Sequence, residues 1–438
     1  MKHMSTVIAP VVLGVLVAAC GGGVETDPAP SGPSTNPPAG PGATDPGAKP
    51  SDPAPVDHGA PSDKYPAFTP DIAQLVNNGG QVLSKPVITT VTWSNETNAD
   101  TFEKFGDQLG GSDYWKSVTS EYGVGAATSG AEHHVRIPTA GPASISDADL
   151  SSLVQTSLSD VASGWPAPTA DSVYILYLPK GTALMLQGQD ACKQGVGGYH
   201  ESVTVNGKEV AYAIVPQCNN AKVDVTTLSA SHELAEAATD PYPNKTPAWV
   251  GFDDDHLSWE LFNQFQSENG DACEFYRTST LTGGTSDFPF TVQRQWSNAS
   301  AKGGHDPCVP APAGPYYNVT PLGTETITAD FSALGGPKKV SSKGFVVAIG
   351  ETRTIPLGFY SDAPTAAWSI KAIEGGVSGP PSTPRVELSL DTTSGQNGQK
   401  AYLTVKVLQQ GKTKTELVTI VSTANNVPHY MPILIGTP

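Results

Sequence analysis

The sequence predicts an α+β or α/β domain followed by an all-β domain. Apolar strands alternate with amphipathic helices between residues 65 and 315. After residue 316 the helical periodicity disappears, and short strands with alternating polar and apolar residues take its place. The 438 residues include 45 glycines and 39 prolines but only 15% charged residues. Turns and irregular backbone must therefore be abundant, which excludes an all-helical protein.

Two strands and two helices define the first domain, residues 65–315. Residues 87–93 are rich in β-branched side chains, and residues 172–179 form a continuous apolar run typical of a strand buried on both faces. A helix is predicted over residues 99–109. A second helix follows Ser146, a candidate N-cap, and its apolar face has the spacing i, i+3, i+4, i+8, with Leu150, Leu153, Val154 and Leu158.

The second domain, residues 316–438, has a different pattern. Strands are predicted at residues 386–390, 403–407 and 417–421, and a turn-forming segment at residues 394–398 separates the first two. Strands at this spacing are typical of a β-sandwich of immunoglobulin-like type. The domain carries no catalytic constellation, so the sequence gives it a packing or spacing function, with surface binding as the alternative.

The amino end predicts export and a lipid anchor. Residues 7–19 form an apolar run that is too short to span a bilayer and has the character of a signal peptide, residues 1–19. The small residues before Cys20 resemble a bacterial lipobox, which implies lipidation of Cys20; an ordinary signal peptide is the alternative. Residues 20–64 lack large apolar side chains and predict a disordered Pro/Gly-rich tether. We therefore expect a protein anchored in the membrane of the bacterial cell envelope, on the outer membrane or cell surface.

The composition also indicates which partners to expect and whether the cysteines form disulfides. The formal charge of −17, without a basic cluster, argues against nucleic acid as a partner. Apart from Cys20 there are four cysteines, an even number that predicts two disulfides in an exported protein. Three pairings are possible, and we favour the two that close local loops, Cys192–Cys218 and Cys273–Cys308.

The segment with the clearest chemistry is a predicted helix over residues 226–240, with Asp224 among its candidate caps and Pro241 at its end. His232 and Glu236 are four residues apart, so they project from one helix face and can bind one metal ion. Glu233 adjoins them, where its carboxylate can act as the general base toward water. This is the geometry of an H-E-x-x-H metallopeptidase in which Glu replaces the second His.

A zinc site of this kind needs a third protein ligand from another segment. Asp240 lies about 12 Å from His232 along a continuous helix and would serve only if the helix unwound before Pro241. Residues 268–274 bring several carboxylates close to Cys273. We expect Asp271 to be the third ligand, with Glu274 as the second choice.

Two of these motifs resemble motifs of a known protein family. His-Glu-Leu-Ala-Glu at 232–236 and Gly-Asp-Ala-Cys-Glu at 270–274 are similar to motifs in the plant phosphate-induced, EXORDIUM-like extracellular proteins and in secreted bacterial and fungal proteins. The resemblance covers residues 65–315 and implies an exported protein with a metallopeptidase-like core. The tether and the β-sandwich lie outside it.

The ligand set differs from that of the H-E-x-x-H enzymes. Glu236 and Asp271 would give the ion two anionic ligands, which offset its charge and make it less electrophilic. Three outcomes are open: zinc with slow peptide hydrolysis, a harder oxygen-seeking ion, or a structural site. His200, within the predicted Cys192–Cys218 loop, is a candidate oxyanion stabiliser or further ligand, with a surface histidine as the alternative.

The leading hypothesis is thus a lipid-anchored extracytoplasmic protein with a zinc-dependent peptide hydrolase domain. Zinc is the expected cofactor, and a peptide or protein is the expected substrate. The rival hypothesis is a non-catalytic cell-envelope binding or adhesion protein in which the same residues form a structural or vestigial metal site.

Overall fold

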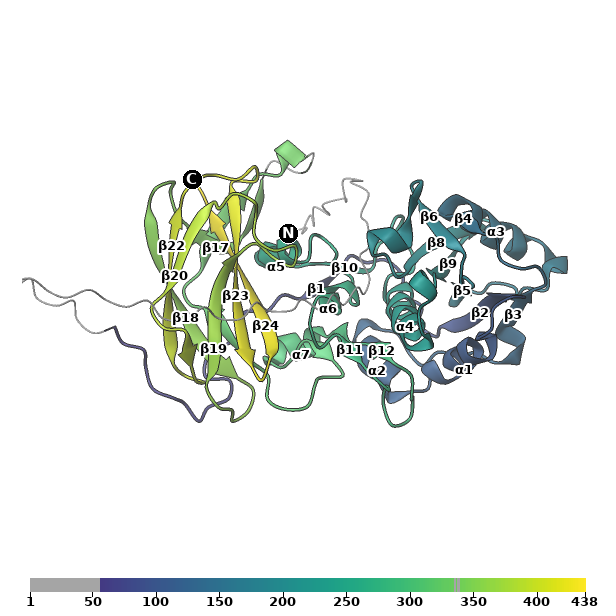
Figure 1. Ribbon diagram of the computed structural model, residues 1–438, viewed down its shortest axis with the longest axis horizontal. Helices are drawn as coiled ribbons and strands as arrows, with labels where there is room; N and C mark the ends of the chain where they lie inside the picture. The colour runs from purple at the N-terminus through teal and green to yellow at the C-terminus, as the bar shows by residue number, and fades with distance from the viewer. Residues whose placement is uncertain (1–55, 335, 337–338) are drawn as a thin grey trace, which may run out of the picture.

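The computed structural model describes residues 56–334, 336 and 339–438 (Figure 1). The predicted signal peptide, Cys20 and most of the predicted tether lie outside the described residues. Figure 1 shows a β-sandwich at one end of the molecule, an α/β region at the other end, and short helices and strands between them.

The α/β region is built on a five-stranded sheet in the order β3-β2-β5-β9-β8. Its strands are β2 (Val87–Trp93), β3 (His134–Ile137), β5 (Ser172–Tyr177), β8 (Tyr199–Val205) and β9 (Lys208–Val215). Four of them are parallel, and the edge strand β8 pairs antiparallel with β9. Asn206 and Gly207, both with positive φ, form the tight turn between these two strands. The predicted strands at 87–93 and 172–179 are confirmed as β2 and β5.

Helices cover both faces of this sheet. The helices on one face are α1 (Ala99–Leu109), α2 (Asp113–Thr119) and α4 (Val223–Thr239), and α3 (Asp147–Ser159) lies on the other. Strand β5 contributes to both cores, because Val173 and Ile175 face α1, α2 and α4 whereas Tyr174 and Leu176 face α3. Burial on both faces explains the continuous apolar run.

Two helices follow their local sequence signals. Helix α1 has the predicted bounds. Helix α3 begins after Ser146, whose side chain accepts a hydrogen bond from the backbone N–H of Asp149, and the Asp149 side chain bonds back to Ser146 in a capping box. The predicted N-cap Ser146 is therefore confirmed.

The start predicted for the motif helix was wrong, and its predicted end before Pro241 is confirmed. Helix α4 begins at Val223, so Asp224 lies in its first turn rather than before it, and the N-cap is Lys222, which makes no capping bond through its side chain. At the other end Asp240 has left helical geometry and is the C-cap. Packing around the whole helix stabilises it without a side-chain cap.

Short elements lie around the α/β region and connect it to the sandwich. They include a three-stranded sheet, three two-stranded ribbons and three short helices. These are β4 (Ser144–Ser146), β6 (Ala183–Leu186) and β7 (Gln189–Asp190); β1 (Leu75–Asn77) with β10 (Trp249–Phe252); β11 (Thr280–Leu281) with β12 (Val292–Gln293); β13 (Gln295–Trp296) with β14 (Cys308–Val309); and α5 (Leu257–Phe262), α6 (Asp271–Glu274) and α7 (Asn298–Gly303).

The C-terminal region is a sandwich of two sheets, as the strand pattern predicted. Among the described residues, one sheet has four antiparallel strands and the other has six, of which only β17 and β24 are parallel neighbours. The first contains β15 (Tyr317–Pro321), β18 (Thr352–Ser361), β22 (Lys400–Val407) and β20 (Val386–Leu390). The second contains β16 (Glu325–Ala329), β17 (Val340–Val346), β24 (Val427–Gly436), β23 (Thr415–Ala424), β19 (Trp368–Glu374) and β21 (Ser394–Gly395). The predicted turn at 394–398 thus begins with a short strand.

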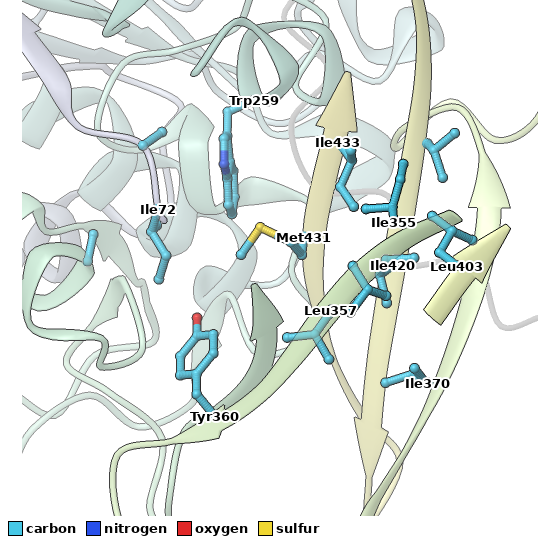
Figure 2. Close-up of a cluster of buried hydrophobic side chains, with 14 of the residues drawn as sticks. Ile72, Trp259, Ile355, Leu357, Tyr360, Ile370, Leu403, Ile420, Met431 and Ile433 are labelled. Carbon is cyan, nitrogen blue, oxygen red and sulfur yellow. The ribbon is translucent and has the colours of Figure 1, made fainter. Parts of the chain in front are cut away.

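The sandwich core continues into the connecting elements. Trp259 of α5 and Ile72 belong to the same buried cluster as Met431 and Ile433 of β24 (Figure 2). Trp259 also packs edge-on against Trp296, with 5.3 Å between ring centroids. This shared core fixes the connecting elements against the sandwich.

Both predicted disulfides are present. Cys192 pairs with Cys218 and Cys273 pairs with Cys308, which indicates an oxidising, extracytoplasmic environment. No helix within the described residues is long and apolar enough to cross a membrane.

The last residues of the predicted tether lie against the sandwich. The backbone N–H of Lys400 donates to the carbonyl of His58 at 2.7 Å, and the Asn397 amide donates to the carbonyls of Ser62 and Lys64. Tyr402 donates to the carbonyl of Asp57 at 3.0 Å. These bonds to backbone carbonyls order residues 57–64 despite their lack of large apolar side chains.

Candidate metal centre

The three motif residues of α4 are deeply buried. His232, Glu233 and Glu236 are 1%, 1% and 3% exposed. Ionisable side chains are rarely buried this far without a charged partner, because removing a charge from water is costly. The helix therefore does not present them as a solvated face.

His232 and Glu236 face each other across one turn, and Asp271 joins them. His232 Nε2 lies 3.1 Å from Glu236 Oε2 and 3.7 Å from Asp271 Oδ1. The backbone N–H of Asp271 donates to Glu236 Oε1 at 3.0 Å, which holds the start of α6 against α4. Two atoms that bind one zinc ion at about 2.1 Å lie about 3.4 Å apart in tetrahedral geometry. These separations are of that size.

Gln293 of β12 fixes the tautomer of His232. Its amide Nε2 donates to the carbonyl of Gly270 at 2.7 Å, so its Oε1 is the atom that faces His232 Nδ1, at 3.1 Å. Because that oxygen can only accept, Nδ1 of His232 carries the proton. Nε2, the atom that faces Glu236 and Asp271, is therefore the nitrogen that can bind an ion after it loses its proton.

His200 enters the same cluster from the edge strand β8. Its Nε2 donates to the backbone carbonyl of Asp240 at 3.0 Å, and its Nδ1 lies 3.7 Å from Glu236 Oε2 and 3.8 Å from Glu233 Oε2. Glu268 Oε1 is 3.7 Å from Nε2. The side chain of His200 is 4% exposed, so it is not a surface histidine.

Two glycines make room for the carboxylates. A Cβ atom on Gly198, just before β8, would lie 2.4 Å from Glu233 Oε1. A Cβ on Gly270 would lie 2.7 Å from Glu236 Oε1 and 2.8 Å from His232 Nδ1. Any larger residue at either position would displace the cluster, so both glycines are part of its construction.

Burial and the charges of neighbouring side chains shift the pKa values of the residues in this cluster. Burial and the surrounding carboxylates raise the pKa of Glu268 and of Asp271 well above their ordinary values. Burial alone would lower the pKa of His200, but a hydrogen bond that it donates to Glu233 and the charges of Glu236 and Glu233 raise it to about 9. Burial would raise the pKa of Glu236, but the charge of His232 lowers it.

The side chains present fit a bound metal ion. Among the described residues, His232 Nε2, Glu233 Oε1 and Asp271 Oδ1 are buried atoms without a hydrogen-bond partner, a state that is costly unless an ion or water occupies the space between them. Two groups of three donors come within 4.8 Å of one another in the described chain: His232 with Glu233 and Glu236, and His200 with Glu236 and Glu268. Nitrogen and oxygen donors of this kind suit zinc.

The alternative predicted ligands, Asp240 and Glu274, make other contacts. Asp240 Oδ1 accepts a hydrogen bond from the backbone N–H of Ala248 at 2.7 Å. Glu274 is buried at the end of α6, and its charge contributes to the raised pKa of Asp271. Neither residue belongs to the two donor groups found among the described residues. Asp271 is outside these groups as well, but its Oδ1 lies 3.7 Å from His232 Nε2.

Sequence reasoning missed Glu268, Gln293, Gly198 and Gly270. Glu268 could have been found, because it lies three residues before Asp271 in the same acidic segment. Gln293 lies 61 residues from His232 and gives no local signal.

Comparisons with known proteins do not assign the chain to a family. No model of a protein family matches the chain, and no curated protein does so either. Among solved structures, a chimeric titin Z1Z2 functionalized with a KLER exogenous peptide from decorin is 11% identical; the match covers 27% of this chain and 98% of that one, with a TM-score of 0.15. A similarity at that score carries no argument, and the site must be interpreted from its own geometry.

Proposed function

We propose that this protein is a zinc-dependent peptide hydrolase of the bacterial cell envelope. The observation that carries the proposal is that Glu236 Oε2 and Asp271 Oδ1 lie 3.1 Å and 3.7 Å from His232 Nε2 in a buried site, beside the unbonded Glu233 Oε1. Anchoring through a lipidated Cys20 and an immunoglobulin-like character of the sandwich belong to the same proposal. The two disulfides support the extracytoplasmic location.

His232, Glu236 and Asp271 would hold the ion. When bound, zinc supplies a Lewis acid that polarises a carbonyl oxygen and makes water more acidic. Gln293 keeps a proton on Nδ1 of His232 and leaves Nε2 for the ion, and the backbone N–H of Asp271 orients the Glu236 carboxylate. Both contacts pre-organise ligand atoms before the ion arrives.

Glu233 would be the general base. It adjoins His232 along the chain, and burial raises its pKa, so it can accept a proton from water and later release it to a leaving amine. Its contact with His200 holds the carboxylate on the side of the Glu236 ligand. The roles of ligand and base thus fall on separate carboxylates.

Burial favours a second function, a structural metal site in a non-catalytic envelope or adhesion protein. A catalytic zinc keeps one coordination position open to substrate, whereas structural sites are closed. Glu233 is 1% exposed, and Asp271 is 7% exposed. In this alternative the ion would tie α4 to α6 and stabilise the fold.

The substitution Glu233→Gln separates the two functions. We expect the purified variant to keep its zinc, measured by plasma mass spectrometry, and to lose at least about 99% of the cleavage of a peptide library, because general-base catalysis contributes about 10²- to 10⁴-fold. Glu351→Gln, an exposed position on the sandwich, is the control and should cleave normally.

Two outcomes would contradict the hydrolase. Full cleavage by Glu233→Gln would remove Glu233 from the mechanism. A wild-type protein that binds zinc, melts at a lower temperature without it and cleaves no peptide would establish the structural function instead.

A further inference from the structure

The two donor groups of the centre share one residue. The first contains His232 and the second contains His200, and Glu236 belongs to both. The two histidines come from different elements, helix α4 and strand β8, and both face the same oxygen of Glu236. Glu236 Oε2 is 3.1 Å from His232 Nε2 and 3.7 Å from His200 Nδ1.

Each histidine directs toward Glu236 the ring nitrogen that can bind an ion after it loses its proton. A backbone carbonyl can only accept, so the bond to the carbonyl of Asp240 keeps a proton on Nε2 of His200 and leaves Nδ1 for the ion. Gln293 does the same for His232 and leaves Nε2 for the ion. A metal-binding histidine typically donates its second N–H in this way. His200 is therefore prepared as a ligand to the same degree as His232.

The charge of the cluster exceeds what one ion can balance. Five carboxylates surround the two imidazoles: Glu233, Glu236, Asp240, Glu268 and Asp271. When all five are ionised and both imidazoles are neutral, as metal-binding imidazoles are, one divalent cation leaves three negative charges uncompensated, and two cations leave one. Uncompensated charges are costly in a buried site.

We propose that the centre binds two divalent cations with Glu236 as a bridging ligand. His232 Nε2 and Asp271 bind the first ion, and His200 and Glu268, which form one donor group with Glu236, bind the second. The inference rests on the proposed function for the first ion position, and the second position is additional to it. In two-metal sites the ions lie about 3.5–4 Å apart and together clamp the attacking and leaving atoms of a hydrolysed bond.

Cobalt titration of the purified full-length protein tests this arrangement. Two Co²⁺ ions per chain are expected in the metal-free wild type, with spin coupling between them in the electron paramagnetic resonance spectrum because a carboxylate bridges them. His200→Gln, which keeps a donor toward the Asp240 carbonyl, and Glu268→Gln should each bind one uncoupled ion. Glu236→Ala should bind neither ion tightly. His305→Gln, at a histidine whose side chain is 58% exposed, is the control and should keep two.

The alternatives give distinct results. One ion per chain in the wild type that is lost in both His200→Gln and His232→Ala would overturn the bridge and make His200 a ligand of a single ion. Two ions in His200→Gln, with an unchanged melting temperature, would remove His200 from the centre. Two coupled ions in a protein that cleaves no peptide would refute the hydrolase and leave the two-ion centre standing, whereas no bound ion at all would refute both.

Discussion

At the scale of single residues, the most informative side chain outside the proposed ligand set is Gln293. It touches His232 through Oε1 and the carbonyl of Gly270 through Nε2, so it links the α4 wall to the loop that carries Asp271. We expect Gln293→Leu to weaken zinc binding about 10- to 100-fold, because the histidine loses the acceptor that fixes its tautomer.

Competition with a chromophoric chelator measures this change. Gln155→Leu is the matched control, since Gln155 also donates to a backbone carbonyl, that of Thr204, but lies on the exposed side of α3. Equal zinc affinity in the two variants would show that Gln293 does not orient His232.

Single residues also show which parts of the site can be predicted from the amino-acid sequence. His232, Glu233 and Glu236 share one helix, so their proximity follows from the i, i+4 spacing alone. His200 and Gln293 reach the site from β8 and β12, and only the folded topology brings those strands to α4. A residue whose role depends on a distant strand leaves no periodic signal.

At the scale of elements, the two disulfides close loops of similar length around the site. Cys273–Cys308 joins α6 to β14 across 35 residues, and Cys192–Cys218 spans 26 residues around β8 and β9. The loop-closure model predicts that each stabilises the fold by about 3.5–4 kcal/mol, with a difference of about 0.3 kcal/mol between them.

We expect different effects on the metal. Cys273→Ala with Cys308→Ala should lower zinc affinity more than the matched pair of substitutions at Cys192 and Cys218, because Cys273 lies two residues after Asp271 in α6. Urea denaturation gives the stability of each variant, and zinc titration gives the affinity. Similar losses of both quantities in the two double variants would show that the α6 loop is held by packing alone.

Element boundaries were predictable where the signal was local. Helix α3 follows from its capping box and α1 from its amphipathic spacing. The start of α4 was not predictable, because residues 226–239 are all buried and tertiary packing, rather than a cap, stabilises the helix. The two-residue strands β13 and β14 lie below the length at which alternation can be recognised.

At the scale of the whole molecule, a charged cluster joins the sandwich to the connecting elements. Lys343 of β17 donates to Asp71 Oδ1 at 2.8 Å and lies 3.8 Å from Asp255. His256, just before α5, lies between two carboxylates, with Nδ1 2.6 Å from Asp253 Oδ1 and Nε2 3.2 Å from Asp71 Oδ1. The cluster lies beside the shared hydrophobic core around Trp259.

This cluster predicts a pH dependence of stability. Burial alone would lower the pKa of His256, but Asp253 and Asp71 raise it from 6.5 to about 9. A raised histidine pKa stabilises the fold fully below about pH 6.5, and that contribution is lost as the pH rises through about 9. Asp71 acts at the other end, because His256 and Lys343 outweigh burial and lower its pKa to about 2, so its contribution is present above about pH 3.8 and is lost as the pH falls through about 2.

We expect the free energy of unfolding to fall by at most about 3 kcal/mol between pH 6.5 and 9 on account of His256. The slope of the free energy of unfolding against pH therefore measures the contribution of this charged cluster. His256→Gln should reduce that slope and lower the stability near pH 6, because Asp71 and Asp253 lose their partner. Urea denaturation at several pH values measures the difference, and His305→Gln is the control, since His305 is bound to Asp362 at a largely exposed position. Parallel curves for wild type and His256→Gln would show that the contact between the sandwich and the rest of the chain is apolar packing, with the charged cluster contributing nothing to it.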